Sequence, residues 1–394
     1  MMESEKTGVI YLRYDKQMLA DYNKGRVLEE ILKRGPINRA EIAKQLGLSI
    51  PTIMKIVDEF QREGILRTVG KAESTGGKRP ELYEIIKDAY YCIGVDLGRF
   101  KLKIVLTNMM GEILVKKHED ISHIDEPAEV ISIIEKHIEE LIENQQIPNS
   151  KVMGIGLGVP GIIEKESGTI LYSPDFGWEK VDLVTDLKKK FGFWVEIENS
   201  NRTGALAEKW MGVAQSSNNL FSINIGHGIG AAILKEEDIY QGSSGASGEF
   251  GHLILDKDGP LCDCGNRGCL EAISSGNAIA KRMGMKEAKE VFDLARAGNE
   301  QAIRVIDEAV EYLGIGIASV INILDPDMVV LSGGVMQSSD LFWDKLCQEV
   351  KKRQIKYGGR KVKIKAGILG EDATALGAVV LLIKNFKNHG GQIV

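Results

Sequence analysis

The sequence predicts an α/β protein in which a small N-terminal winged helix-turn-helix domain precedes a larger two-lobed body. Three observations support this prediction. The N-terminal part of the chain contains short amphipathic helices that are separated by turn residues. A glycine-rich hairpin pattern occurs twice, and patterns of buried strands alternate with helices through the remainder. At 394 residues the chain has room for two or three domains. We expect residues 1–88 to form the first domain and residues 89–394 the body.

The N-terminal helices are predicted from their apolar spacing and their end signals. Residues 23–35 place apolar side chains on one helix face and end at a Gly-Pro pair. A second helix begins at Asn38, which has Glu41 three positions later in capping-box spacing. Ser49 then caps a third helix over residues 50–64. A short helix, a glycine-containing turn and another helix form the helix-turn-helix arrangement.

Two short strands within residues 65–85 flank a glycine-rich basic tip, which predicts a wing after the third helix. Residues 1–80 are mildly basic, with 15 Lys/Arg against 11 Asp/Glu. Together these features favour DNA binding, with the third helix in the major groove and the wing on phosphate or in the minor groove. A three-helix packing module without a DNA role is the alternative. The residues expected at DNA are Ser49, Pro51, Thr52, Lys55, Lys78 and Arg79, with Met54 as a further candidate.

Three of the five cysteines fall within eight residues, and a histidine lies upstream of them. His252, Cys262, Cys264 and Cys269 offer one imidazole and three thiolates, which suits a tetrahedral Zn²⁺ ion. Four protein ligands leave no open coordination position, so we expect a structural zinc site within residues 252–269. Buried or redox-active thiols without a metal are the alternative.

Residues 91–114 and 220–242 both follow the pattern of strand, glycine turn and strand. An Asp in a strand followed by glycine resembles the start of the phosphate-binding hairpin of actin-like or hexokinase-like proteins. The repetition indicates a two-lobed body built from a duplicated α/β unit. Between the hairpins lie a buried strand with its turn at 152–163 and a strand that runs into a helix at 198–210.

Composition excludes several classes of protein. The net charge of −6 argues against a protein that coats nucleic acid over its whole surface. No apolar run approaches the length of a membrane span, and the N-terminus lacks signal-peptide character. We therefore expect a cytoplasmic protein, in which a metal explains clustered cysteines better than a disulfide does.

The body motifs resemble the ROK family, which is named for repressors, open reading frames and kinases of sugar metabolism. This resemblance implies an actin/hexokinase-like ATPase fold for the body. The N-terminal winged helix resembles the repressor branch, because free-standing sugar kinases of the family lack it. The motifs are GVDLG (94–98), GLGVPG (156–161), IGHGIGAAI (225–233), GASGEFGH (245–252), GPLCDCGNRGCLEA (259–272) and LSGG (331–334).

The resemblance also implies a sugar site. Glu249, His252 and Glu271 would contact sugar hydroxyls, and the other ring nitrogen of His252 would bind zinc. Asn199 matches a further sugar-binding residue of the family, and Ser200 follows it. Xylose and glucose are the first candidates for the sugar.

Kinase activity is the main alternative, and three departures from the kinase motifs argue against it. Family kinases carry an Asp as general base where this chain has Ser200. Arg99 and Phe100 replace the small and hydroxyl residues of the first phosphate turn, and His227 replaces a Thr in the second. Glu198 could in principle substitute as the base. We therefore expect no catalysis.

The sequence thus predicts a sugar-responsive transcriptional repressor that binds a palindromic operator as a homodimer or tetramer. Sugar binding would release the operator. A sugar kinase with a DNA-binding head and an adaptor controlled by a protein partner are the rival hypotheses. The identity of the sugar, the operator sequence and the choice between repression and activation stay open.

Overall fold

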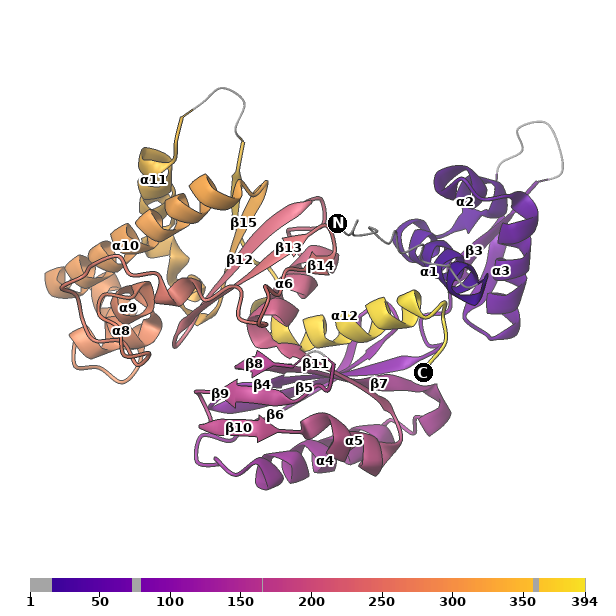
Figure 1. Cartoon of the computed structure of the whole chain (residues 1–394), viewed down its shortest axis with the longest axis horizontal. Helices are drawn as coiled ribbons and strands as arrows, with labels where there is room; N and C mark the ends of the chain where they lie inside the picture. Colours follow the sequence, from indigo (N-terminus) through magenta and orange to yellow (C-terminus); the bar gives the residue numbers. More distant parts are fainter. Residues whose placement is uncertain (1–15, 73–78, 165, 357–360, 394) are drawn as a thin grey trace, which may run out of the picture. The chain divides into compact units, whose positions relative to one another are not determined.

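The computed structural model describes residues 16–72, 79–164, 166–356 and 361–393 (Figure 1). The chain divides into two compact units. The first is made from both ends of the chain, because it combines residues 1–91 with residues 108–110 and 383–394. The second comprises residues 92–107 and 111–382.

The first unit has the winged helix-turn-helix fold that the sequence predicts. Its helices pack against a three-stranded antiparallel sheet of order β1-β3-β2. The elements are α1 (Lys16–Arg34), β1 (Ile37–Asn38), α2 (Arg39–Leu46), α3 (Ile50–Arg62), β2 (Leu66–Lys71) and β3 (Glu81–Ile85).

The end signals of the helices act as predicted. The Asn38 side chain accepts a hydrogen bond from the Glu41 amide at 2.9 Å, and the Glu41 carboxylate accepts one from the Asn38 amide, which completes the capping box. Gly47 ends α2 in the left-handed conformation, with φ of 66°. Ser49 then caps α3, which buries Ile53, Ile56, Val57 and Phe60 in this unit.

The C-terminal segment completes the core of the first unit. Helix α12 (Ala373–Asn388) belongs to the second unit up to Leu382 and to the first unit from Ile383 onward. The ring of Phe386 meets that of Tyr90 edge-on, with centroids 5.6 Å apart. Nζ of Lys387 lies 3.0 Å from a carboxylate oxygen of Glu29 on α1. This unit therefore needs residues from both ends of the chain.

The second unit contains two five-stranded sheets of similar design. In the first, β11-β7-β4-β5-β6, β5 and β6 pair antiparallel while β7 and β11 pair parallel. In the second, β14-β13-β12-β15-β16, β12 pairs antiparallel with β13 and parallel with β15. The first-sheet strands are β4 (Tyr91–Leu97), β5 (Lys101–Asn108), β6 (Ile113–Asp120), β7 (Val152–Val159) and β11 (Trp194–Asn199). The second-sheet strands are β12 (Asn219–Ile225), β13 (Ile229–Lys235), β14 (Asp238–Ile239), β15 (Met328–Ser332) and β16 (Lys363–Ala366).

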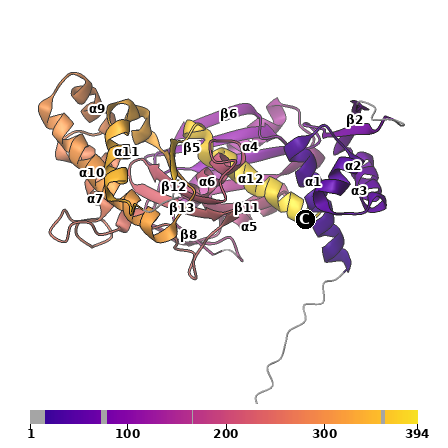
Figure 2. The ribbon, with the colours of Figure 1, turned by 90° about the horizontal axis from the view of Figure 1, so that it is seen from above.

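Helices and a small third sheet surround these strands. In Figures 1 and 2, the long helix α10 lies beside α11. The third sheet consists of β8 (Ile162–Ile163), β9 (Ile170–Ser173) and β10 (Trp178–Val181). The remaining helices are α4 (Pro127–Asn144), α5 (Leu183–Phe191), α6 (Ser200–Trp210), α7 (Leu270–Ser274), α8 (Gly276–Arg282), α9 (Ala288–Arg296), α10 (Glu300–Leu324) and α11 (Trp343–Arg353). Short 3-10 turns lie at 149–151, 250–252, 334–341 and 370–372.

Two glycines let α12 lie directly on the first sheet. A Cβ atom on Gly94 of β4 would come within 2.2 Å of the Ala375 carbonyl oxygen, and one on Gly156 of β7 within 2.0 Å of the Ala378 carbonyl oxygen. Side chains at these strand positions would force the helix away from the sheet.

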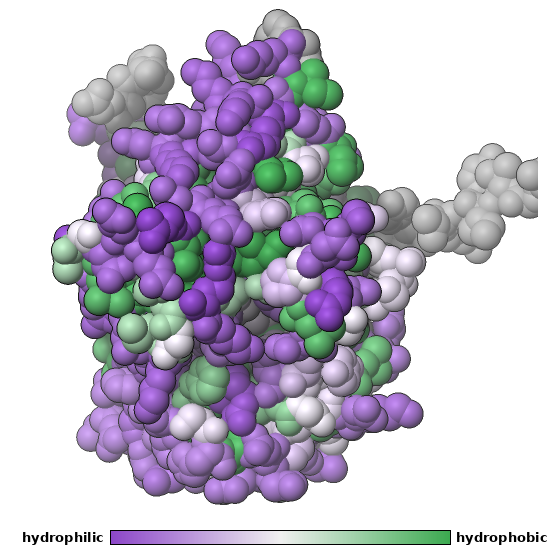
Figure 3. Space-filling model, turned by 90° about the vertical axis from the view of Figure 1, so that its left-hand side faces the viewer, coloured by the Kyte–Doolittle hydropathy of each residue, from purple (hydrophilic) through white to green (hydrophobic). Residues whose placement is uncertain are grey.

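The surface drawn in Figure 3 is mainly hydrophilic, with hydrophobic residues in small groups. Among the described helices, none combines the length and the apolar character that a bilayer span requires.

Candidate functional site

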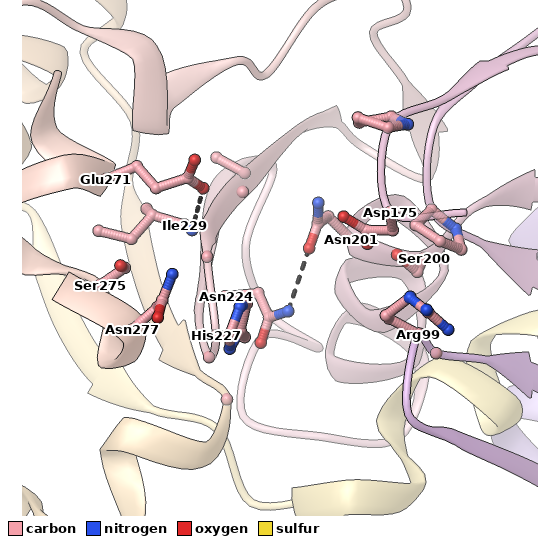
Figure 4. A pocket seen from close by; sticks show the side chains of 18 of the residues that line it. Arg99, Asp175, Ser200, Asn201, Asn224, His227, Ile229, Glu271, Ser275 and Asn277 are labelled. Carbon is pink, nitrogen blue, oxygen red and sulfur yellow. Dashed lines mark hydrogen bonds between the residues drawn. The ribbon is translucent and has the colours of Figure 1, made fainter. Parts of the chain in front are cut away.

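A large cavity of about 1500 Å³ opens in the second unit. The turn after β4, the turn between β12 and β13 and the start of α6 all contribute to its lining (Figure 4). The predicted sugar residues Asn199, Ser200, Glu249, His252 and Glu271 all line this one cavity. The fold therefore brings residues that are far apart in the sequence to one cavity, and their binding of a sugar stays a prediction.

Glu271 and Glu249 present carboxylates to the cavity in different ways. Glu271, on α7, accepts a hydrogen bond from the Ile229 amide at 2.8 Å, which ties it to the second hairpin (Figure 4). Glu249 is more exposed, and its carboxylate lies 3.8 Å from Nε2 of His252. The other ring nitrogen of His252, Nδ1, lies 3.6 Å from Sγ of Cys262. His252 thus faces the cavity with one nitrogen and the cysteine cluster with the other.

The cysteine cluster has the dimensions of a tetrahedral metal site. The ligand atoms of His252, Cys262, Cys264 and Cys269 all lie within 4.8 Å of one another. Sγ of Cys264 is 3.6 Å from Sγ of Cys269. Zinc–sulfur bonds of about 2.3 Å in a tetrahedron place neighbouring sulfurs about 3.8 Å apart, so the four residues fit Zn²⁺.

The backbone around the cluster acts on Cys264 and on the closure of the loop, while burial raises the pKa values of the Cys262 and Cys269 thiols. A hydrogen bond from the backbone amide of Asn266 lowers the pKa of the Cys264 thiol to about 7, which favours the thiolate that metals bind. Gly268 has φ of 69°, and a Cβ atom there would lie 1.5 Å from the Asp256 carbonyl oxygen. Only glycine allows the loop to close this tightly around the four ligands.

Asn199 already uses its side-chain amide within the protein. Its Nδ2 donates to the Gly161 carbonyl at 2.9 Å, and its Oδ1 accepts from the Asn201 amide at 2.9 Å as the N-cap of α6. The side chain of Asn201 in turn accepts from Nδ2 of Asn224 at 3.1 Å, across to the second hairpin (Figure 4). A sugar contact by Asn199 stays a prediction, and Asn201 and Asn224 join it as polar groups on the cavity wall.

Glu198, the alternative general base, has both carboxylate oxygens engaged. Oε1 lies 3.2 Å from the Arg202 guanidinium and accepts from the Asn199 amide, while Oε2 accepts from Gln241 at 3.0 Å. The Glu198 side chain is 10% exposed and that of Arg202 is 5% exposed. A buried, paired carboxylate of this kind is poorly placed to take a proton from a substrate.

Arg99 and Phe100 fill the turn after β4 with side chains that contact other parts of the second unit. The Arg99 guanidinium lies 2.7 Å from a carboxylate oxygen of Asp125 and 5.5 Å from the ring centroid of Phe176. The ring of Phe100 meets that of His227 edge-on, with centroids 5.3 Å apart. Thus an aromatic contact joins the turns of the two hairpins.

Asp175 is a cavity residue that the sequence analysis missed. It lies in the loop between β9 and β10, exposed to the cavity, and makes no hydrogen bond or ion pair among the described residues. Partial desolvation and the nearby Glu271 raise the pKa of its carboxyl, while His227 and Arg99 act in the opposite direction. No motif pointed to it, because only the fold brings this loop to the cavity.

Asp96, at the end of β4, also lines the cavity. Its carboxylate is 3.6 Å from Nζ of Lys103, which also lies 3.6 Å from Glu371. Burial raises the pKa of Asp96 to about 6, although Lys103 opposes this shift. The group is therefore costly to ionise in the folded protein.

We expect the variant Asp96→Asn to flatten the pH dependence of stability. An aspartate whose pKa is about 6 when folded and 3.8 when unfolded contributes stability below pH 3.8 that is lost as the pH rises to 6. Relative to the wild type, the free energy of unfolding of the variant should therefore rise by about 2 kcal/mol between pH 4 and pH 7. Urea unfolding followed by tryptophan fluorescence measures this difference. A constant difference between the two proteins across that range would contradict it.

Four of the expected DNA-contact residues, Ser49, Pro51, Thr52 and Lys55, lie at the start of α3. Pro51 and Lys55 are exposed there. The Ser49 hydroxyl is 2.7 Å from that of Thr52 and accepts from the Thr52 amide, so it caps the helix. Arg79 is exposed just before β3. Lys78 lies outside the described residues.

A helix-turn-helix head and a body with two hairpin sheets and a Cys/His cluster define this protein as a DNA-binding regulator with a kinase-like body. Residues 92–385 match the ROK family, and residues 21–67 match the winged helix-turn-helix DNA-binding family. The chain belongs to the ROK family.

Known relatives include both regulators and kinases. The chain is 32% identical to a xylose repressor of Bacillus spizizenii, over 94% of this chain and 97% of that protein. It is 31% identical to a glucokinase of Thermotoga maritima, over 74% of this chain and 96% of the glucokinase. Among solved structures, a ROK family transcriptional regulator, described as a homologue of the Escherichia coli MLC protein, superposes with a TM-score of 0.83 at 28% identity, covering 95% of this chain and 98% of that one.

Proposed function

We propose that this protein is a sugar-responsive transcriptional repressor whose body binds a monosaccharide and whose winged helix binds operator DNA. The observation that carries the proposal is the combination, in one chain, of a complete helix-turn-helix with a cavity that gathers Glu249, His252 and Glu271. The resemblance to xylose repressors extends over 94% of the chain, whereas the glucokinase matches 74% of it.

The sugar site consists of Asn199, Ser200, Glu249, His252 and Glu271 in this proposal. Paired carboxylates accept hydrogen bonds from neighbouring hydroxyls, which is how proteins recognise polyols. Xylose is the first candidate for the effector because two relatives that match 94% of the chain are named xylose repressors, and glucose is the second.

We propose zinc as the structural metal at His252, Cys262, Cys264 and Cys269. When bound there, it would orient the imidazole of His252 toward the sugar and fix the loop that precedes Glu271. The supporting observations are the ligand distances and the donor set of one nitrogen and three sulfurs.

We propose that the body has lost kinase activity. Ser200 has no group that could act as a base near neutral pH, Glu198 is paired, and the turn after β4 carries Arg99 and Phe100. ADP release with xylose, glucose or N-acetylglucosamine should stay at the background rate.

A palindromic operator has two symmetric half-sites, and each would be contacted by the winged helix of one chain. The working form in this proposal is therefore a homodimer or tetramer in the cytoplasm. Residues 1–88 would supply the DNA contacts and residues 89–394 the sensor.

Binding to the DNA upstream of its own gene tests the proposal. The titration is made at fixed salt, with and without a panel of monosaccharides and without ATP, because phosphate contacts make affinity depend on salt. A sequence-specific complex that one sugar weakens at least tenfold, corresponding to about 1.4 kcal/mol of coupling, is the expected result. A complex that no sugar or sugar phosphate alters would refute the sensor.

The variant Asp175→Asn is expected to weaken effector binding about tenfold while leaving DNA binding without sugar unchanged. The Asp175 carboxylate has no hydrogen-bond partner among the described residues and faces the cavity, so it is free to accept a hydrogen bond from a sugar hydroxyl. Isothermal titration of the sugar measures the change. The control variant is Asp258→Asn, which changes an exposed carboxylate between His252 and Cys262. Equal affinities in all three proteins would remove Asp175 from the site.

A further inference from the structure

The first half of α3 exposes apolar side chains where a DNA-reading helix usually exposes polar ones. Ile50 is 50% exposed and Met54 is 43% exposed. They are four residues apart and therefore lie on one side of the helix, with the exposed Pro51 next to Ile50. The buried face of the helix, formed by Ile53, Ile56, Val57 and Phe60, points elsewhere.

The two hydroxyl side chains near these apolar residues already hydrogen-bond to each other. The Ser49 hydroxyl caps the helix and hydrogen-bonds to the Thr52 hydroxyl. Further along the exposed face, Asp58 pairs with Arg39, whose guanidinium also lies 4.9 Å from the ring centroid of Tyr83. Few free hydrogen-bonding groups are left at the start of α3 to read base edges.

Exposed cations lie on α3 and on the neighbouring helix α2. Lys55 follows Met54 directly and makes no ion pair among the described residues, and Lys44 on α2 and Arg62 at the end of α3 are exposed as well. Exposed cations on the same helices as an apolar pair match a major groove, in which phosphates line both edges and the thymine C5-methyl group is the apolar feature of the floor.

We propose that Ile50 and Met54 read thymine methyl groups in the major groove of each operator half-site, and that Lys55 contacts an adjacent phosphate. This inference rests on the proposed function. It assigns sequence specificity at the start of α3 to apolar contacts rather than to hydrogen bonds from Ser49 and Thr52.

The experiment begins with full-length protein and randomised DNA, from which binding sites are selected at fixed salt. Each thymine of the selected half-site is then replaced by deoxyuridine, which pairs identically but lacks the methyl group. Affinities are measured for the wild type, Ile50→Ala, Met54→Ala and the control Met18→Ala. Met18 is 61% exposed on α1, so this control removes a methionine side chain away from α3.

For at least one thymine, we expect deoxyuridine to lower wild-type affinity about fourfold per half-site, the effect of removing one methyl group from an apolar contact. Met54→Ala or Ile50→Ala should bind the thymine site correspondingly more weakly and should no longer distinguish thymine from deoxyuridine at that position. Met18→Ala should behave as the wild type. This loss of discrimination separates a methyl contact from a general change in DNA shape.

Three results would overturn the inference. Replacing thymine by deoxyuridine could leave the affinity unchanged at every position, or lower the affinities of the wild type and both α3 variants equally. In either case the protein binds DNA, but these residues do not read methyl groups. If the variants change the oligomeric state in light scattering and not the DNA discrimination, the apolar pair belongs to a protein interface. If no DNA sequence is selected at all, the proposed function fails together with the inference.

Discussion

Replacing Cys269 by serine is expected to remove the metal ion from the purified protein and to abolish the effect of sugar on DNA binding. Cys269 is fully buried, and it directly precedes α7, which carries Glu271. With one thiolate missing, the three remaining ligands bind zinc much more weakly, and the loop before Glu271 loses its anchor. Metal analysis by mass spectrometry should find about one zinc per chain in the wild type and almost none in the variant.

The control for this prediction is Cys347→Ser, which changes a half-buried cysteine on α11 that is not part of the cluster. That variant should retain its metal and its sugar response. DNA binding without sugar should persist in Cys269→Ser, since the winged helix lies in the other unit. Equal zinc contents in the two variants would show that Cys269 is not a ligand.

Replacing Glu198 by glutamine is expected to lower the free energy of unfolding of the second unit by about 3–5 kcal/mol, because the substitution leaves the buried Arg202 guanidinium without its counter-charge. Arg202 also donates to the carbonyl oxygens of Gly245 and Ser247, in the loop that leads to Glu249. Effector binding should therefore weaken as well. All four tryptophans lie in the second unit, so urea unfolding followed by their fluorescence reports on the right part of the chain.

The chain offers a matched control for that substitution. Glu300 and Arg304 form another i,i+4 pair on a helix, with side chains 86% and 69% exposed. Glu300→Gln should leave the unfolding transition unchanged, since water screens an exposed pair. A similar loss in both variants would mean that burial of the Glu198–Arg202 pair is not the cause.

Local signals in the sequence predicted the parts of the fold that depend on local chemistry. The capping box of Asn38 and Glu41 and the cap at Ser49 both form as expected, because each depends on residues within one helical turn. The close approach of His252 to the three cysteines was likewise predictable, since glycine-rich spacing within 18 residues limits how the chain can wrap around one ion.

Contacts that the tertiary fold creates could not be predicted in this way. Arg99 meets Asp125 and Phe176, which come from separate loops and share no spacing pattern with it. Asp175 reaches the cavity only because the loop between β9 and β10 turns toward it. The sequence also did not predict that the Asn199 side chain caps α6 and donates to the Gly161 carbonyl.

The unit that carries the recognition helix is formed by both ends of the chain. In it, Phe386 contacts Tyr90 and Lys387 pairs with Glu29. A ribosome delivers residues 383–394 only after it has made the entire sensor. The head therefore reaches its final packing when the body is already synthesised, and an unfinished chain lacks part of the head's core. For protein engineering, the same feature means that grafting this head onto another sensor requires the C-terminal segment to be transferred with it.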